Sequence, residues 1–118
     1  MFLYSECVDI LMQMILIYMT NPTEEEARRI ARHLLDRRLI ACGNIFQTDS
    51  IYRWKEKIKD EKEFVLIAKT RPELYEKVRA EVEAIHSYDC PCIIRIDADA
   101  NPAYIDWVLG QTGNPRNI

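Results

Sequence analysis

Residues 39–58 form a long stretch in which no helical stripe of apolar side chains appears. β-Branched and aromatic residues recur along it, and these residue types favour extended backbone. The polar group at 47–50 predicts a bulge or bend within the strand. The polar run at 59–62 predicts the turn, after which residues 62–70 return as the antiparallel partner. The chain therefore has to accommodate a long β-hairpin.

The segment before this hairpin predicts a strand followed by a helix. The short apolar run at 14–20 is typical of a buried strand. Thr23 followed by Glu26 is a capping box, and it predicts an amphipathic helix that ends near Arg38. The residues expected on the buried stripe of this helix are Ala27, Ile30, Ala31, Leu34 and Leu35.

The segment after the hairpin predicts the same two elements in the reverse order, a helix followed by a strand. Thr70 and Glu73 form a second capping-box signal, which predicts a helix with its apolar stripe at 74–85. Residues 92–96 predict a short strand, and Asn101 followed by proline predicts the start of a terminal helix. The order β-α-β-β-α-β plus one helix predicts an α+β, ferredoxin-like fold. In this fold the split β-α-β units form an antiparallel sheet with helices on one face.

Length and composition favour a single domain. The chain has 118 residues, 30% charged and 48% hydrophobic, with a net charge of -3. These values suit a globular cytoplasmic protein, and the absence of a basic excess disfavours nucleic acid as a partner. We expect an N-terminal extension at 1–13, the domain at 14–110 and a loose tail at 111–118. The first segment has neither the basic start of a signal peptide nor the length of a membrane span.

The predicted hairpin is several times longer than an ordinary strand of about 5–6 residues. Part of it must project beyond its own sheet and expose unpaired strand edges, which invite association with another chain. A closed symmetric oligomer would cover these edges. The alternative is a hairpin that folds back over its own helices.

Several short segments resemble those of one family. ACGN at 41–44, SIYRWKEKI at 50–58, the Lys, Thr and Arg of 69–71, and HSYDCPCI at 86–93 resemble in order and spacing the signature segments of the CutA family of divalent-cation tolerance proteins. The resemblance covers roughly 14–109 and implies a stable homotrimer in which hairpin strands pair between subunits. The chain departs from the family pattern at Glu56, where glycine is usual, and at Cys90-Pro91-Cys92, where valine, proline and glutamate are usual.

Four residues are candidate metal ligands. Cys90 and Cys92 are two residues apart and His86 precedes them, and thiolate and imidazole suit copper and zinc. Cys42 lies in the ACGN segment, so the resemblance implies that its thiol is metal-associated. The alternative for each cysteine is a packed side chain, because cysteine is often buried as a small hydrophobe. For Cys42 this alternative predicts a side chain facing the helices. With Cys7 the chain has four cysteines, which are too few for a disulfide scaffold, so we expect their thiols to be reduced.

A second group of candidates belongs to a ligand cleft or an interface. Tyr52, Trp54 and Lys55 match the most distinctive family segment, and they would line a cleft between subunits or anchor the interface itself. Lys69 and Arg71 flank a predicted helix start, where an anion is readily bound. The alternative for these two is a plain helix cap with solvated charges.

Taken with these patterns, the family resemblance implies a cytoplasmic homotrimer that binds divalent cations, copper or zinc, and contributes to metal tolerance or homeostasis without catalysis. The alternative is a regulatory or scaffold trimer, resembling the PII proteins, that binds a small anionic ligand in clefts between subunits. An enzyme is disfavoured because the sequence shows no activated nucleophile or acid–base pair. No organic cofactor, nucleic acid or membrane partner is expected.

Overall fold

A computed structural model describes residues 13–113 of the chain. The extension predicted at 1–13 therefore lies outside the described residues, except for Gln13, and so do residues 114–118. Within the described part, the strands form one antiparallel sheet in the order β2-β3-β1-β4. The strands are β1 (Met14–Asn21), β2 (Cys42–Trp54), β3 (Lys57–Thr70) and β4 (Ile93–Ala98).

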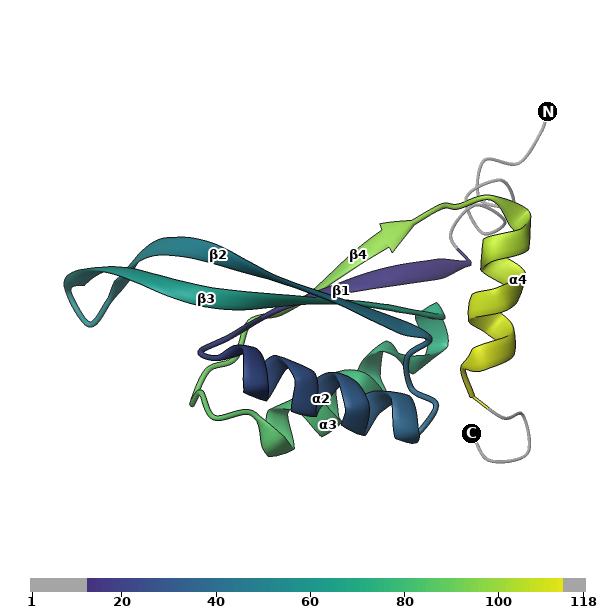
Figure 1. Cartoon of the computed structure of the whole chain (residues 1–118), viewed down its shortest axis with the longest axis horizontal. Helices are drawn as coiled ribbons and strands as arrows, with labels where there is room; N and C mark the ends of the chain where they lie inside the picture. Colours follow the sequence, from purple (N-terminus) through teal and green to yellow (C-terminus); the bar gives the residue numbers. More distant parts are fainter. Residues whose placement is uncertain (1–12, 114–118) are drawn as a thin grey trace.

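Two helices cover one face of this sheet, as Figure 1 shows. They are α2 (Glu24–Asp36) and α3 (Tyr75–Ile85), and the 3₁₀ turn η1 (Pro72–Leu74) leads into the second. The core between these layers is fully buried at Ile17 and Leu66 on the sheet and at Val78 on α3. The terminal helix α4 (Pro102–Gln111) packs through Ile105 and Val108 in a second cluster beside the start of β1. The predicted α+β, ferredoxin-like arrangement is thus confirmed.

Helix α2 begins as the sequence predicts. Thr23 has extended backbone, and its hydroxyl accepts a hydrogen bond of 3.1 Å from the amide of Glu26. The buried stripe is Ala27, Ile30, Ala31 and Leu34. The prediction that Leu35 is buried is wrong, because its side chain is 41% exposed. Each residue turns about 100° around a helix, so Leu35 lies beyond the stripe that faces the sheet.

The second capping box is not formed. The Thr70 hydroxyl donates instead to the carbonyl oxygen of Leu39, at 2.7 Å in a buried position, and Thr70 ends β3. The N-cap of η1 is Arg71, which makes no side-chain cap bond. The prediction fails because the sheet extends to Thr70, where a buried hydroxyl needs a partner within the fold.

The hairpin is more regular than the sequence suggests, and its turn comes earlier in the chain. Strands β2 and β3 pair without a slip from Cys42 opposite Lys69 to Trp54 opposite Lys57. The bulge predicted at 47–50 and the turn predicted at 59–62 are therefore both wrong. Lys55 and Glu56 make the turn, with φ of 51° and 67°. This pattern is that of the tight type I′ turn that matches the twist of a hairpin.

Much of this hairpin extends beyond the rest of the sheet, as Figure 1 shows. Strand β1 reaches only as far as Asn21, which pairs with Phe64. From Glu63 to the turn, β3 therefore has β2 as its only neighbour in the sheet among residues 13–113. The projecting hairpin is confirmed, and the alternative that it folds back over the helices is excluded. Polar side chains suit 59–62 because this part of the strand projects into solvent.

The start of the predicted tail is not loose. Helix α4 continues to Gln111, and Thr112 is fully buried and donates to the carbonyl oxygen of Val108 at 2.7 Å. The amide of Gly113 donates to the carbonyl oxygen of Arg38 at 2.7 Å. None of the helices in 13–113 combines the length and apolar character needed to cross a membrane.

Candidate functional site

Two of the candidate metal ligands, Cys42 and His86, lie near opposite ends of β1. Cys42 pairs with Lys69, which lies opposite Leu16 near the start of β1. His86 contacts the carbonyl oxygen of Thr20 near the end of β1. Leu16 and Thr20 are four positions apart, or about 13 Å along a strand. A single subunit therefore does not bring Cys42 together with His86.

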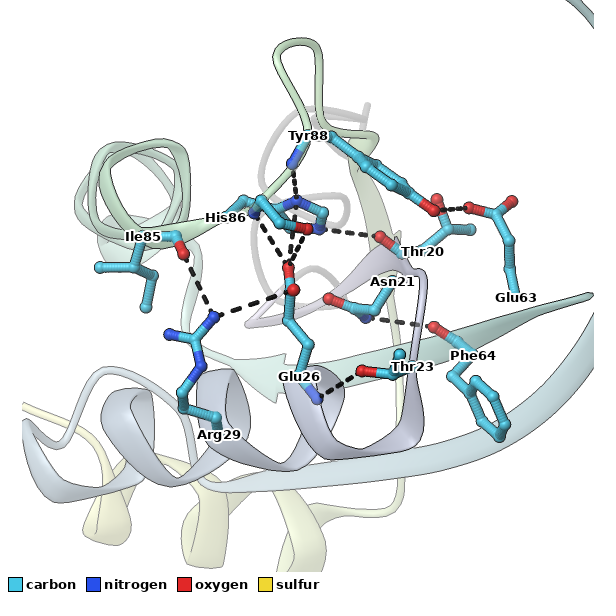
Figure 2. Close-up of polar contacts among 11 residues, drawn as sticks. Thr20, Asn21, Thr23, Glu26, Arg29, Glu63, Phe64, Ile85, His86 and Tyr88 are labelled. Atoms are coloured by element: carbon cyan, nitrogen blue, oxygen red, sulfur yellow. Dashed lines mark hydrogen bonds and ion pairs between the residues drawn. The ribbon is translucent and has the colours of Figure 1, made fainter.

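His86 is tied into the fold through both ring nitrogens, as Figure 2 shows. Its side chain is 0% exposed. Nε2 lies 2.9 Å from the Thr20 carbonyl oxygen, which can only accept, so this nitrogen carries the proton. Nδ1 accepts from the Tyr88 amide at 3.0 Å. Neither nitrogen is left with a free lone pair for a metal within this arrangement.

Glu26 holds the segment that follows α3 against α2. Its Oε2 accepts from the amide of Ser87 at 3.0 Å and from the Ser87 hydroxyl at 2.9 Å. The same oxygen lies 3.4 Å from Nδ1 of His86. Figure 2 shows Arg29 beside it, and that guanidinium also donates to the Ile85 carbonyl oxygen at 3.3 Å. The segment that leads to Cys90 is therefore anchored on its helix side.

Tyr88 anchors the same segment to the sheet. Its hydroxyl donates to Oε2 of Glu63 at 2.7 Å, and the Glu63 side chain is buried. Burial, followed by this hydrogen bond, raises the pKa of Tyr88 well above its usual value. The tyrosine is thus a neutral donor to the carboxylate at physiological pH. Sequence analysis overlooked Glu63 because it ends a run of charged residues at 59–63, and its contact with Tyr88 is visible only in the fold.

The two thiols that follow Tyr88 differ in exposure. Both are free, with Cys90 exposed and Cys92 partly buried. Burial raises the pKa of the Cys92 thiol. A hydrogen bond with the Thr20 side chain offsets part of this rise, and the nearby Glu63 and Cys90 add to it. Throughout 13–113, no three His, Cys, Asp or Glu side chains are grouped so as to hold a metal ion.

Cys42 and Lys69 lie on the face of the sheet opposite α2 and α3. Successive residues of a strand point to opposite faces of the sheet. Gly43, the residue after Cys42, is on the face toward the helices, because a Cβ there would lie 2.9 Å from the Leu66 side chain in the core. The alternative in which Cys42 faces the helices is therefore wrong. The Lys69 ammonium lies 5.4 Å from the centre of the Tyr104 ring, a cation–π contact.

Arg71 caps the end of α4. Its guanidinium donates to the Leu109 carbonyl oxygen, to the Thr112 carbonyl oxygen at 2.8 Å and to the Thr112 hydroxyl at 3.0 Å. A cation at a helix C-terminus satisfies the last carbonyl groups and the helix dipole. Arg71 thus already has a structural role at the position where sequence analysis places an anion.

The aromatic candidates lie far from Lys69, toward the tip of the hairpin. Tyr52 is ten positions from Cys42 along β2, or about 33 Å of strand. Its hydroxyl donates to Oε1 of Glu61 at 2.5 Å. Trp54 is half-exposed, and Lys55 forms the turn. A cleft that joins Tyr52 to Lys69 would need a second subunit, so that arrangement stays a prediction.

The fold and the candidate site together define a structural class of proteins. It consists of small α+β proteins whose sheet is covered by helices on one face and whose central hairpin extends past that sheet. The chain belongs to the CutA1 family: the model described as CutA1 divalent ion tolerance protein matches residues 15–111.

Individual relatives agree with this assignment. The divalent-cation tolerance protein CutA of Pyrococcus horikoshii is 41% identical over 100 residues, which cover 84% of this chain and 98% of the relative. The crystal structure of CutA1 from that organism matches with a TM-score of 0.82 at 39% identity, over 85% of this chain and 99% of the other. The CutA structure from Archaeoglobus fulgidus, described as periplasmic, matches with a TM-score of 0.79 at 45% identity, over 80% and 94%.

Proposed function

We propose that the protein is a homotrimer that binds divalent cations, copper or zinc, and contributes to metal tolerance without catalysing a reaction. Its membership of the CutA1 divalent ion tolerance family supports the link to metal ions. We further propose that it acts in the cytoplasm, as its composition suggests, although one relative is described as periplasmic.

The observation that carries the proposed assembly is the apolar surface on the uncovered side of the sheet. Phe46, Ile94 and Ile96 are 47%, 49% and 43% exposed there. Further along the hairpin, on its other face, Ile51 and Ile58 are 69% and 61% exposed and form a second apolar surface. Such a surface marks an interaction site, and the free edge of β2 is a template for another strand. A closed oligomer, in which copies of the chain are related by a symmetry axis, would cover both the apolar surface and the free edge of β2.

The divalent site is proposed to lie between subunits. Within one chain Cys42 is remote from His86, and residues 13–113 contain no group of three ligands. A symmetric assembly brings side chains from different subunits together, which supplies the further ligands that a divalent ion requires. The alternative of an anion-binding regulatory trimer has less support, because Lys69 and Arg71 already contact Tyr104 and the end of α4.

Light scattering and elemental analysis on the same sample test this proposal. A trimer that carries near-stoichiometric copper or zinc after dialysis is the expected result. A metal-free trimer that also fails to take up added Cu²⁺ or Zn²⁺ would contradict the metal-binding part. A monomer at micromolar concentration would contradict the assembly.

A further inference from the structure

The segment Cys90-Pro91-Cys92 holds two thiols at a fixed spacing. Proline sets its own φ and disfavours helical backbone at the preceding residue, Cys90, where the chain bends before it enters β4. Cys92 leads directly into β4 at Ile93. Alternate residues of an extended chain are about 6–7 Å apart. The segment is anchored at its start by Tyr88, which contacts Glu63.

This spacing suits a bridging ion better than a disulfide. A disulfide needs Cα atoms about 4.4–6.8 Å apart and Cβ atoms about 3.8 Å apart, so an extended pair is at or beyond its limit. An ion with metal–sulfur bonds of about 2.3 Å joins sulfur atoms that are as much as about 4.6 Å apart. Both thiols are free in the structure. The pair can therefore converge on an ion while Cys92 keeps its place directly before β4.

Among residues 13–113, the surroundings of the pair offer no further soft ligand. His86 lies closest in sequence, but both of its nitrogens are engaged by Thr20 and Tyr88. Glu63 is near Cys92, but its carboxylate already accepts from Tyr88 and is a hard oxygen ligand. Zinc in a structural site takes four ligands, and calcium and magnesium take six or more oxygen atoms. Within 13–113 the pair is thus incomplete for each of these ions.

We propose that Cys90 and Cys92 form a two-thiolate site for a soft monovalent cation of the Cu(I) class, built within a single subunit. Thiolates are the ligands that select Cu(I) over harder ions. The ion would displace one proton from each thiol and leave a complex with one net negative charge. The site goes beyond the divalent-cation binding proposed above, because it requires neither Cys42 nor contact between subunits.

Competition for Cu(I) against the chelator bicinchoninate, with reduced full-length protein under anaerobic conditions, tests the site. We expect one Cu(I) per chain, and an affinity about 100-fold lower in Cys90→Ser and in Cys92→Ser. Cys42→Ser is the matched control, since that thiol lies at the other end of β1, and it should bind as the unmodified protein does. Circular dichroism and light scattering establish that each variant is folded and assembled alike.

Unchanged Cu(I) affinity in both Cys90→Ser and Cys92→Ser would overturn the site, and so would an equal loss in Cys42→Ser. Added Zn²⁺ should not displace the Cu(I), and displacement at equal concentration would contradict a two-coordinate soft site. Uptake of Cu²⁺ and Zn²⁺ by the assembled protein is measured separately in the double variant that combines Cys90→Ser with Cys92→Ser. Divalent uptake that persists there, while Cu(I) binding is lost, supports two separate sites.

Discussion

Two tyrosines are held as neutral phenols by carboxylates of β3. Tyr88 donates to the buried Glu63, and Tyr52 donates to the exposed Glu61. The hydrogen bond to Glu61 is the largest cause that raises the pKa of Tyr52 to about 12, followed by desolvation and the negative charges of Glu61 and Glu63. Removing the phenol proton would place two negative groups side by side, which explains the direction of both shifts.

The Tyr52 contact predicts a loss of stability at alkaline pH. The folded pKa of about 12 lies above the ordinary value near 10, so the folded state binds the proton more tightly. Its stabilising effect is complete below about pH 10 and disappears as the pH rises to about 12. Tyr52→Phe should flatten this fall, as measured by guanidinium unfolding across that range.

Absorbance at 295 nm provides the control for this prediction. The difference between the titrations of the unmodified protein and Tyr52→Phe isolates this one phenol. Glu61→Gln should return its pKa toward 10, because it removes the charged acceptor. A Tyr52 that already ionises near pH 10 in the unmodified protein would show that the hydrogen bond to Glu61 does not hold the proton.

At the level of the elements, the hairpin is determined by its turn and its register. The two-residue turn at Lys55 and Glu56 aligns β2 with β3 over their whole length. Both turn residues have positive φ, which is unfavourable for side chains other than glycine, asparagine or aspartate. The family resemblance leads us to expect glycine at position 56, and the backbone conformation there is the one that glycine adopts most easily.

Glu56→Gly should therefore stabilise the hairpin. Relief of the left-handed conformation at φ 67° is expected to raise the free energy of unfolding by about 1 kcal/mol. Guanidinium unfolding measures this change. Lys57→Gly is the matched control, because Lys57 lies in β3 and glycine weakens a strand by about 0.5–1 kcal/mol. Equal destabilisation by both substitutions would show that strain at Glu56 is negligible.

At the level of the whole molecule, residues 13–113 present the free edge of β2 and, on the side of the sheet that the helices leave uncovered, a large apolar surface. Among residues 13–113, only α4 packs at the end of that side, around Met14 and Leu16 at the start of β1. Beyond it, Phe46, Ile94 and Ile96 remain exposed. A monomer would keep this surface in water, at a cost of about 25 cal/mol for each Å² of apolar area left unburied.

A charge on this surface should dissociate the proposed trimer. Phe46→Lys places an ammonium group among the apolar side chains, where it would be desolvated without a partner. We expect light scattering to show a shift from trimer to monomer at micromolar concentration. Leu35→Lys is the matched control, because Leu35 is a similarly exposed apolar residue on α2 and should leave the mass unchanged. A trimer that survives Phe46→Lys would place the interface elsewhere.

Local signals in the sequence determined which elements form and in which order. The capping box at Thr23 and the apolar stripes with a helical period act within a few residues, so they can be read without the fold. The same is true of the short apolar runs that became β1 and β4. This is why the ferredoxin-like architecture and the projecting hairpin could be predicted.

Only the tertiary structure decided where distant segments meet. The turn at Lys55 follows from the pairing of β2 with β3, and Thr70 turns inward because Leu39 offers it a buried acceptor. His86 and Cys42 are both plausible metal ligands in the sequence, but the fold places them at opposite ends of β1 and engages both nitrogens of His86. Hydrogen-bond partners and distances of this kind depend on contacts between residues far apart in the chain, which local patterns do not encode.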